Sequence, residues 1–319
     1  MANPRPFRRQ RGIALITAVL VVALAAMAST AILVSANIAI RRTANLQESE
    51  LAWWYAAGVE SWVKSVLERD LDDNRIDALT DLWAQPVDYL PIDEGFARGQ
   101  VTDLQGRFNL NNLGTPDTTE YEQQLRVFTR LLGVLDVADD YQARAIGAAI
   151  RDWIDADSEP TGADGAEDND YLRLDPPYRA GNRMITSVSE LLAIRGITRE
   201  IYQALAGVVT AVPQTGVPIN VNTAPLPVLL ALAAEPRPAI ETFAAERIEK
   251  PAEDVQALFS ASGVFTAEDA PSGMMSVSSS FFMLRSEVFI GSGRVALYSF
   301  YFRPPGAPPA VYGRSTDVE

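Results

Sequence analysis

Acidic side chains are concentrated in one stretch of this 319-residue chain, between Asp136 and Asp170, where the basic residues are Arg144 and Arg151. Carboxylates crowded into one loop repel one another unless a cation lies among them. Hard cations such as Ca²⁺ take about six to eight oxygens from carboxylates and backbone carbonyls, and an acidic loop offers both. The spacing of the acids and glycines does not match the EF-hand loop. Two interpretations therefore stay open, a calcium site and a solvated acidic loop.

The candidate calcium ligands are the acids that surround Gly162 and Gly165, two residues that allow the chain to fold back on itself. The first set is Asp155, Asp157, Glu167, Asp168 and Asp170, and the second is Asp152 and Asp164. Asp152 and Asp155 lie three residues apart, so they share a face where a helix ends. Large apolar residues flank the loop and indicate that it is packed against the protein: Trp153, Ile154, Tyr171 and Leu172.

The composition argues against catalysis. The chain contains no cysteine and no histidine, which excludes a cysteine nucleophile, a thiolate metal site and the usual general base of hydrolase triads. Paired carboxylates such as Asp155 and Glu167 are the residues of glycoside hydrolysis, but no aromatic sugar platform accompanies them. We predict that the protein is not an enzyme.

Nucleic-acid binding is also disfavoured, because the formal net charge is -14 and phosphate contacts need Lys and Arg. The segment from Ser187 to Ala211, with Gly196 between two helical patterns, resembles a helix-hairpin-helix module. Its neighbouring arginines are surrounded by acids: Arg183, Arg195 and Arg199. We therefore expect no nucleic-acid partner.

Helices are predicted on both sides of the acidic loop. Apolar residues recur there at helical spacing, in one stripe at Leu125, Phe128, Leu131, Leu132 and Leu135 and in another at Ile146, Ala149, Ile150 and Trp153. Strand patterns flank this helical block. Before it, Val101–Leu104 and Arg107–Leu110 surround Gln105-Gly106, and after it Phe281–Ile290 and Arg294–Phe302 surround a glycine-rich turn, so each pair predicts a hairpin.

The order of these patterns predicts an α+β fold in which an all-α domain is inserted into a small head. The head comprises residues 71–115 and 266–303, the insert residues 116–265, and a flexible proline-rich tail residues 304–319.

An uncharged run from Ile13 to Ile40 precedes the head, and at a rise of about 1.5 Å per residue it is long enough to cross a membrane as a helix. Arg5, Arg8, Arg9 and Arg11 precede the run, so the positive-inside rule keeps the N-terminus cytoplasmic. The helical pattern continues as an amphipathic stem over residues 41–70. The alternative is a secretory signal peptide cut after Ala26-Met27-Ala28, which would release a soluble, secreted calcium-binding protein.

Several of these pieces resemble the K-type minor pseudopilins of type II secretion systems. Gly12, between the basic leader and the apolar run, is similar to a prepilin cleavage site, and Thr17 stands where pilins generally carry a glutamate. Further matching motifs are Asp103-Leu104-Gln105-Gly106-Arg107-Phe108-Asn109-Leu110-Asn111, Asp152-Trp153-Ile154-Asp155-Ala156-Asp157, Gly165-Ala166-Glu167-Asp168, Ser189-Glu190-Leu191 and Ile219-Asn220-Val221-Asn222-Thr223-Ala224.

The resemblance implies a pilin-like αβ head with a large inserted α-domain and a calcium site in the acidic loop. It also implies removal of residues 1–12 by a prepilin peptidase, methylation of the amine of Ile13, and a single-pass protein of the bacterial inner membrane with its bulk in the periplasm. The implied partners are the I-type and J-type minor pseudopilins and other pseudopilins, and the implied place is the tip of the pseudopilus. Thr17 agrees with that place. The pilin glutamate is neutralised by the N-terminal amine of the next subunit, which a tip subunit lacks, and an unpaired charge in hydrocarbon is costly.

Overall fold

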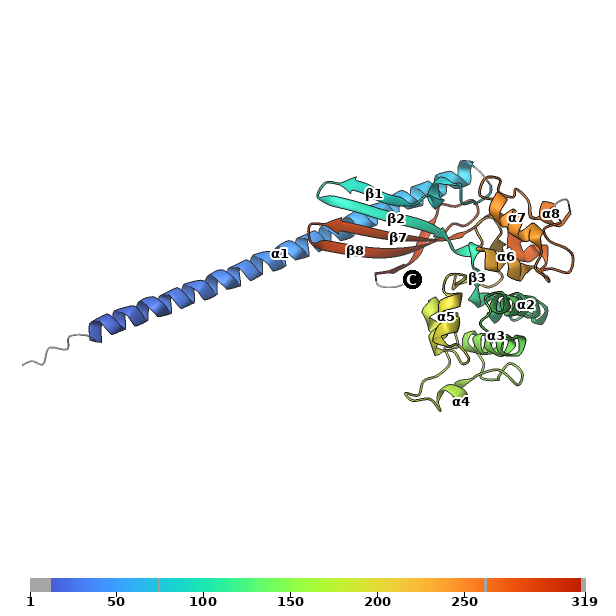
Figure 1. Ribbon diagram of the computed structural model, residues 1–319, viewed down its shortest axis with the longest axis horizontal. Helices are drawn as coiled ribbons and strands as arrows, with labels where there is room; N and C mark the ends of the chain where they lie inside the picture. Colours follow the sequence, from blue (N-terminus) through green and yellow to red (C-terminus); the bar gives the residue numbers. More distant parts are fainter. Residues whose placement is uncertain (1–12, 74, 261–262, 317–319) are drawn as a thin grey trace, which may run out of the picture.

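The computed structural model describes residues 13–73, 75–260 and 263–316. Its first element is a single helix, α1 (Ile13–Asp73), of which the first half projects alone and the second half lies along a sheet (Figure 1). The shorter helices are α2 (Thr118–Val134), α3 (Asp140–Ile154), α4 (Asp168–Tyr171), α5 (Arg199–Leu205), α6 (Leu226–Leu232), α7 (Pro238–Glu246) and α8 (Val255–Ser260). Short 3-10 helices occur at η1 (Leu82–Ala84), η2 (Leu104–Gly106), η3 (Leu110–Gly114), η4 (Val188–Ala193) and η5 (Ser272–Met274).

The head is a five-stranded antiparallel sheet in the order β1-β2-β7-β8-β9. Its strands are β1 (Val87–Ile92), β2 (Gly95–Asp103), β7 (Phe281–Ile290), β8 (Gly293–Phe302) and β9 (Ala310–Ser315). Because β2 pairs directly with β7, residues 104–280 are inserted between two neighbouring strands. The α+β fold with an inserted domain rich in helices is confirmed, but the insert is not all-α as predicted, because it also contains short strands. Four two-residue strands form two small parallel pairs within the insert: β3 (Phe108–Asn109) with β4 (Val209–Thr210), and β5 (Ile219–Asn220) with β6 (Met275–Ser276).

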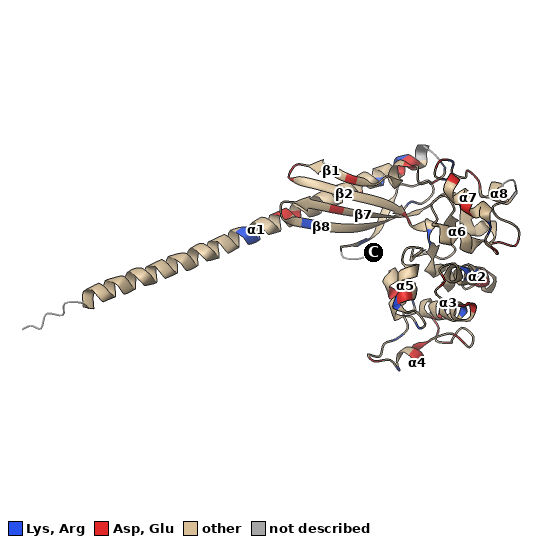
Figure 2. Cartoon of the chain, in the orientation of Figure 1, with Lys and Arg blue, Asp and Glu red and all other residues tan. Residues whose placement is uncertain are grey.

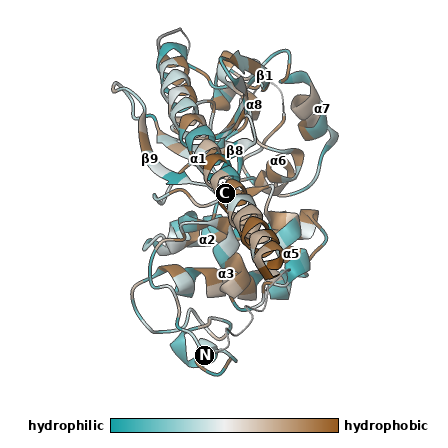
Figure 3. Cartoon of the chain, turned by 90° about the vertical axis from the view of Figure 1, so that its left-hand side faces the viewer, coloured by the Kyte–Doolittle hydropathy of each residue, from teal (hydrophilic) through white to brown (hydrophobic). Residues whose placement is uncertain are grey.

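Helix α1 contains one candidate membrane span, and its first half is apolar and exposed (Figures 2 and 3). The second half packs one face on the inner face of the sheet through Ala52, Ala56, Val63 and Leu67. This helix extends four residues beyond Arg69, to Asp73. The predicted apolar stripe of the stem is only partly buried there, because Leu46, Trp54 and Trp62 face outward.

The hairpin of β7 and β8 is confirmed. Aromatic and β-branched residues fill both strands, which pair from Phe281–Phe302 to Ile290–Gly293. The turn touches α1, where the Ser292 N–H donates to Glu48 (2.8 Å), and Gly291 adopts a φ of +53° beside the Glu48 carboxylate. The side-chain hydrogen bonds of Ser292 hold the pKa of Glu48 below its usual range. The head is thus fastened to α1 just above the apolar run.

Two predictions about the head are wrong. Gln105-Gly106 does not form a hairpin turn, because the Asp103 carboxylate accepts the Gln105 N–H (2.8 Å) and closes the turn of η2, after which Phe108 pairs with Val209. Residues 310–315 are not a flexible tail but the edge strand β9, which pairs with β8. Arg314 secures that strand by a bidentate ion pair with the nearly buried Glu60 of α1 (2.7 and 2.8 Å).

The insert has its own hydrophobic core. Helices α2 and α3 begin at aspartate N-caps, where the carboxylates of Asp117 and Asp139 accept the N–H groups of Glu120 (2.9 Å) and Gln142 (2.8 Å). Their apolar stripes face each other, and α2 also packs against α6. These contacts bury the residues that helical periodicity predicts, among them Leu125, Phe128, Ile146 and Ile150. This core fixes the position and direction of α3, whose last turn leads into the acidic loop.

Candidate metal centre

The acidic loop connects α3 to α4, and its ends rest on a stack of aromatic rings. Trp153 and Tyr171 meet edge to face (ring centroids 5.3 Å), and Tyr171 stacks on Tyr178 (5.4 Å). Trp153, Ile154 and Tyr171 are buried as predicted, whereas Leu172 is exposed. The loop is therefore packed against the insert.

Asp152 shapes this loop from within. Its fully buried carboxylate accepts the backbone N–H groups of Thr161 (2.9 Å) and Ala166 (2.6 Å), which lie on opposite arms of the loop. Gly165 allows this close approach, since a Cβ there would lie 2.2 Å from the Asp152 Oδ2 atom. Asp152, which was predicted as a less favoured calcium ligand, thus has two backbone N–H groups as partners.

Three carboxylates converge in the folded loop: Asp155, Asp157 and Glu167 each place an oxygen within 4.8 Å of the others. Asp155 is half-buried at the C-cap of α3, Asp157 is exposed, and Glu167 is buried before α4. The Oδ1 atom of Asp155 and both carboxylate oxygens of Glu167 are buried without a hydrogen-bond donor. Among the described residues, no Lys or Arg forms an ion pair with any of the three.

The pKa values of these carboxyls reflect this unbalanced charge. Burial, followed by the charges of Asp152 and Asp155, raises the pKa of Glu167 from its ordinary 4.5 to about 7. Burial, followed by the charges of Asp157 and Asp152, raises the pKa of Asp155 from 3.8 to about 6. A hard cation binds carboxylate oxygens that have no hydrogen-bond donor of their own, and its charge relieves the repulsion between them. The three residues therefore fit Ca²⁺.

The other predicted ligands have partners within the protein. Asp168 accepts from the Arg179 guanidinium (2.7 Å) and the Ala180 N–H (3.0 Å). Asp170 pairs with Arg195 (3.3 Å). The Tyr141 hydroxyl donates to Asp164 (3.0 Å). The fold therefore brings together three of the seven candidates, Asp155, Asp157 and Glu167. The other four bond to donors within the protein: Asp152, Asp164, Asp168 and Asp170.

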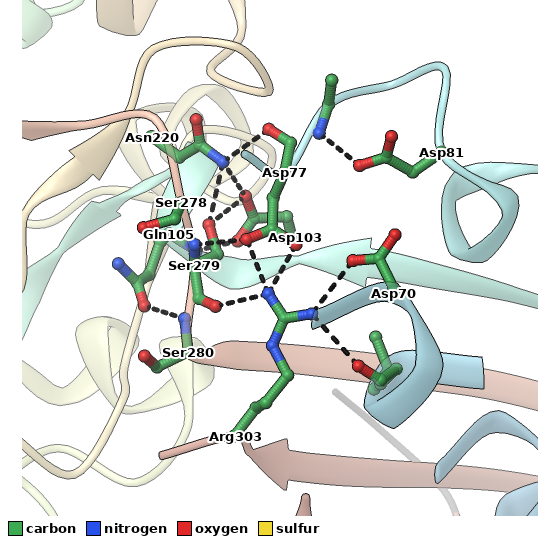
Figure 4. Close-up of polar contacts among 12 residues, drawn as sticks. Asp70, Asp77, Asp81, Asp103, Gln105, Asn220, Ser278, Ser279, Ser280 and Arg303 are labelled. Carbon is green, nitrogen blue, oxygen red and sulfur yellow. Dashed lines mark hydrogen bonds and ion pairs between the residues drawn. The ribbon is translucent and has the colours of Figure 1, made fainter. Parts of the chain in front are cut away.

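A second group of three carboxylates, Asp70, Asp77 and Asp81, also lies within 4.8 Å, at the end of α1 and in the segment that follows it (Figure 4). Here Arg303, at the end of β8, extends a buried guanidinium into the group. It donates to Asp70 (3.0 Å) and to both carboxylate oxygens of Asp77 (2.5 and 2.6 Å). Sequence reasoning did not identify this cluster, because Asp77 and Arg303 lie far apart in the chain and neither belongs to a recognisable motif.

The group formed by Asp70, Asp77, Asp81 and Arg303, here called the Arg303 cluster, is linked to Asp103 through Ser279, because Arg303 donates to the Ser279 carbonyl and the Ser279 hydroxyl donates to Asp103. The Asp103 carboxylate accepts from the hydroxyls of Thr223 and Ser279 (both 2.6 Å) and from the Asn220 amide (3.0 Å). Burial raises the pKa of Asp103 from 3.8 to about 6, although the Ser279 and Thr223 hydrogen bonds oppose the rise. Head and insert are thus joined by one buried polar network.

Two neighbouring asparagines, Asn111 at the end of a matching motif and Asn112 just after it, make contacts within the insert. The Asn111 amide donates to the carbonyls of Ile185 (2.9 Å) and Val212 (2.8 Å) and accepts the Ile185 N–H (2.8 Å). Asn112 donates to the Val217 carbonyl (2.9 Å) and accepts the Val217 N–H (3.1 Å). Asn111 and Asn112 therefore hold together loops of the insert that are distant in sequence.

The predicted processing residues are Gly12 and Ile13. Gly12 is outside the described residues, and Ile13 is the first residue of the helix. The Thr17 hydroxyl donates to the carbonyls of Ile13 (3.1 Å) and Ala14 (3.0 Å), so its polar group is satisfied within the helix. The apolar half of α1 consequently presents neither a charge nor an unsatisfied hydroxyl at this position.

A long apolar N-terminal helix whose second half lies on an antiparallel sheet defines a pilin-like subunit, here one with a large helical insert. A family model described as "Type II secretion system (T2SS), protein K" matches residues 106–214. Type II secretion system protein K of Pseudomonas aeruginosa is 38% identical over 232 residues, covering 70% of this chain and 68% of that protein. The Aeromonas hydrophila protein of the same name is 36% identical over 225 residues, or 68% of each.

A solved structure shares the fold. A chain in the crystal structure of the GspK-GspI-GspJ complex from the enterotoxigenic Escherichia coli type 2 secretion system superposes with a TM-score of 0.77 at 28% identity. The match covers 87% of this chain and 100% of that one. The present chain belongs to the type II secretion system protein K family.

Proposed function

We propose that this chain is a non-enzymatic minor pseudopilin that occupies the tip of the type II secretion pseudopilus and initiates or caps its assembly. The observation that carries the proposal is the position of the insert, which lies beside the head at the end of α1 farthest from the apolar run (Figure 1). Subunits of a pilin-like shaft stack with their helices side by side and their heads in contact. An insert of this size would collide with the next subunit above but is accommodated at the end of a filament.

Gold labelling of assembled pseudopili tests this position directly. Antibodies against the insert should label one end of each filament and leave the shaft unlabelled. Labels spaced along the shaft would contradict the proposal.

The I-type and J-type minor pseudopilins are the proposed direct partners, supported by the complex in which the superposed structure was solved. Co-purification of the full chain with each of them, alone and together, is the corresponding binding test.

Thr17 supports the tip position through the cost of a charge in hydrocarbon. A glutamate there would need a cation from a subunit above, and a tip subunit has none. We expect Thr17→Glu to lower secretion of the system's cargo more than Thr17→Ser, because serine retains the hydroxyl bonded to the Ile13 and Ala14 carbonyls. Full secretion by the glutamate variant would remove this support.

We further propose that a prepilin peptidase cleaves after Gly12, that the new amine of Ile13 is methylated, and that α1 anchors the bulk of the chain in the periplasm. The uninterrupted helix from Ile13 to Asp73 supports this reading, because a signal-peptidase cut before Ser29 would divide it. Intact mass and N-terminal sequence of the membrane-extracted protein decide the matter. A chain that begins at Ser29 and is found free of the membrane would instead support the secreted calcium-binding alternative.

Ca²⁺ is the proposed resident ion of the acidic loop, held by Asp155, Asp157 and Glu167. The ion would supply positive charge to the buried carboxylate oxygens that lack donors, and it would stabilise the insert because it binds the folded loop. Calorimetric titration of the metal-stripped full chain with Ca²⁺ tests this role. Absence of binding, or an unchanged melting temperature when Ca²⁺ is added, would contradict it.

A further inference from the structure

The outer face of the sheet, opposite α1, is covered by the insert over only half of its length. At the far end, Val212 and Val217 of the insert pack on Phe281 and Met283 of β7. Toward the β7–β8 turn, the same face carries a group of charged and aromatic side chains with no segment of the described chain packed over it. These residues, here called the arginine patch, are Tyr89, Phe96, Arg98, Arg285, Glu287, Phe289 and Arg294.

Strand pairing assembles the patch from four neighbouring strands, β1, β2, β7 and β8. Arg98 of β2 lies opposite Glu287 of β7, and Phe289 lies between Phe96 and Arg294. Glu287 is nearly buried, with 4% of its side chain exposed, and it accepts hydrogen bonds from three arginines. These bonds hold the pKa of Glu287 below its ordinary value. The carboxylate therefore stays charged and fixes the guanidinium groups in place.

The arginines are held but not covered. Their side chains are 50% (Arg98), 56% (Arg285) and 58% (Arg294) exposed. Each guanidinium has five N–H donors, and Glu287 accepts two from Arg98 and one from each of the others. Most of the donors are thus available for an anion in a chain whose net charge is -14. Arg98 and Arg285 line a hollow of about 290 Å³, which Asp88 also lines.

An aromatic platform continues the patch. Phe96 stacks on Phe289 (ring centroids 4.7 Å) and on Tyr89 (5.3 Å), while Arg98 and Arg294 each lie 5.5 Å from the Phe289 centroid. Flat apolar rings beside fixed guanidinium groups suit a peptide that offers both carboxylates and apolar side chains.

Distance from the membrane argues against a lipid headgroup. The turn of β7 and β8 contacts α1 at Glu48, eight residues beyond Ile40, so it lies about 12 Å above the apolar run. Arg285 lies five residues farther along β7 from Ile290, which adds roughly 16 Å because the strands run along the helix (Figure 1). A headgroup layer is only about 5–8 Å thick on each side, so the patch stands beyond it.

We propose that the arginine patch is the docking site for an acidic segment of a partner protein. Arg98, Arg285 and Arg294 would bind its carboxylates, and Phe96 and Phe289 would contact its apolar side chains. The proposal does not depend on the tip position or on the metal, since no residue of the patch belongs to the acidic loop.

Fluorescence anisotropy of the full chain in a neutral detergent, with chelator present, tests the proposal. The probe is a labelled ten-residue Glu-Ser repeat, and a Gln-Ser repeat is the control peptide. We expect R98Q/R285Q to weaken binding at least tenfold while preserving the fold, because Glu287 keeps its bond from Arg294. The matched control is R144Q/R179Q, which removes the same charge from exposed arginines of the insert and should weaken binding less than threefold.

A second variant leaves the ion pairs intact. Gln100, opposite Arg285 and lining the hollow, becomes an internal competitor in Q100E, which should weaken binding at least fivefold. Equal weakening in both arginine variants, unchanged binding in Q100E, or equal affinity for the Gln-Ser peptide would overturn the proposal. Displacement of the probe by dihexanoyl phosphatidylglycerol at lower concentration than by unlabelled peptide would overturn it in favour of a lipid site.

Discussion

The protein contains two clusters of three carboxylates whose oxygen atoms lie within 4.8 Å of one another. The two clusters differ in the cation available to offset the repulsion between their negative charges. The cluster of Asp70, Asp77 and Asp81 encloses the Arg303 guanidinium, which is buried with 2% of its side chain exposed. The cluster of Asp155, Asp157 and Glu167 has no such cation among the described residues and leaves buried oxygens without donors. The chain itself thus supplies a cation to the first cluster, whereas under the proposed Ca²⁺ binding the second would take its cation from the solvent.

The difference follows from where each cluster lies. Arg303 joins the end of α1, the segment after it and the end of β8, so its ion pairs belong to the core of the head. The acidic loop is closed by contacts within the insert, chiefly those of Asp152. We therefore propose that the stability of the loop varies with the available Ca²⁺, whereas that of the head junction does not.

Removal of Arg303 should have the largest effect on stability. Arg303→Gln leaves Asp77 buried without a cation, and breaking such a buried pair typically costs about 3–5 kcal/mol. Chemical denaturation of the full chain measures the loss. The control, Arg179→Gln, breaks an exposed pair with Asp168 and should cost less than about 1 kcal/mol. Similar losses in the two variants would mean that Arg303 is not the neutralising cation of its cluster.

Removal of Ca²⁺ should have the next largest effect. At a free concentration one hundred times Kd, a ligand that binds only the folded state stabilises it by about 2.7 kcal/mol, and a chelator should remove that gain. D155N/E167Q should abolish the response to Ca²⁺. In chelator, however, this variant should melt at a higher temperature than the parent chain, because it removes the burial of two charges and their mutual repulsion, which together raise both pKa values. A variant that still responds to Ca²⁺ would show that the ligands lie elsewhere.

The pH dependence of stability should report two buried carboxyls at the head junction, Asp70 and Asp103, whose pKa values are raised. The pKa of Asp103 in the folded chain is about 6 against an ordinary 3.8, and Asp70 is raised to about 7 by burial and the neighbouring Asp77 charge. The folded state therefore binds more protons than the unfolded state above pH 4, and stability should fall as pH rises from about 4 to 7. The slope contributed by one proton is at most about 1.4 kcal/mol per pH unit.

Denaturation midpoints measured between pH 4 and 7 test this sign. D155N/E167Q is the suitable background, since the loop carboxylates titrate in the same range with the same sign. Adding Asp103→Asn should flatten the profile below pH 6. Stability that rises with pH throughout this range would contradict the assignment.

The smallest effect should come from carboxylates that already have protein donors. Asp168→Asn should change the affinity for Ca²⁺ less than threefold, because Arg179 and the Ala180 N–H hold this side chain. Asp155→Asn should reduce the affinity much more. Calorimetric titration of the two variants compares them, and equal losses would extend the ligand set to Asp168.

The sequence predicted elements more successfully than contacts. Periodicity identified the helix from Ile13, the stripes of α2 and α3 and the hairpin of β7 and β8, because each depends on neighbours within a few residues. It failed at Gln105-Gly106, where a buried aspartate closes a 3-10 turn, and at residues 310–315. The pattern after Arg303 is rich in proline, but the ion pair of Arg314 with Glu60 and pairing with β8 order the last strand.

At the candidate metal site, too, the sequence did not predict which side chains contact one another. The sequence located the acidic loop and seven carboxylates, yet it did not distinguish Asp155, Asp157 and Glu167 from acids that pair with Arg179, Arg195 and Tyr141. Those partners come from outside the loop, and no local spacing specifies them.

By itself, then, the sequence determined the apolar span, the α+β order with its insert and the family, because composition, periodicity and motifs are local properties of the chain. The tertiary structure alone decided which carboxylates meet, which pair with Arg303 and which remain without a hydrogen-bond donor. It alone assembled the arginine patch from four strands. The physical reason is that charge compensation depends on distances of a few ångströms between groups that lie far apart in sequence, and only the folded chain sets these distances.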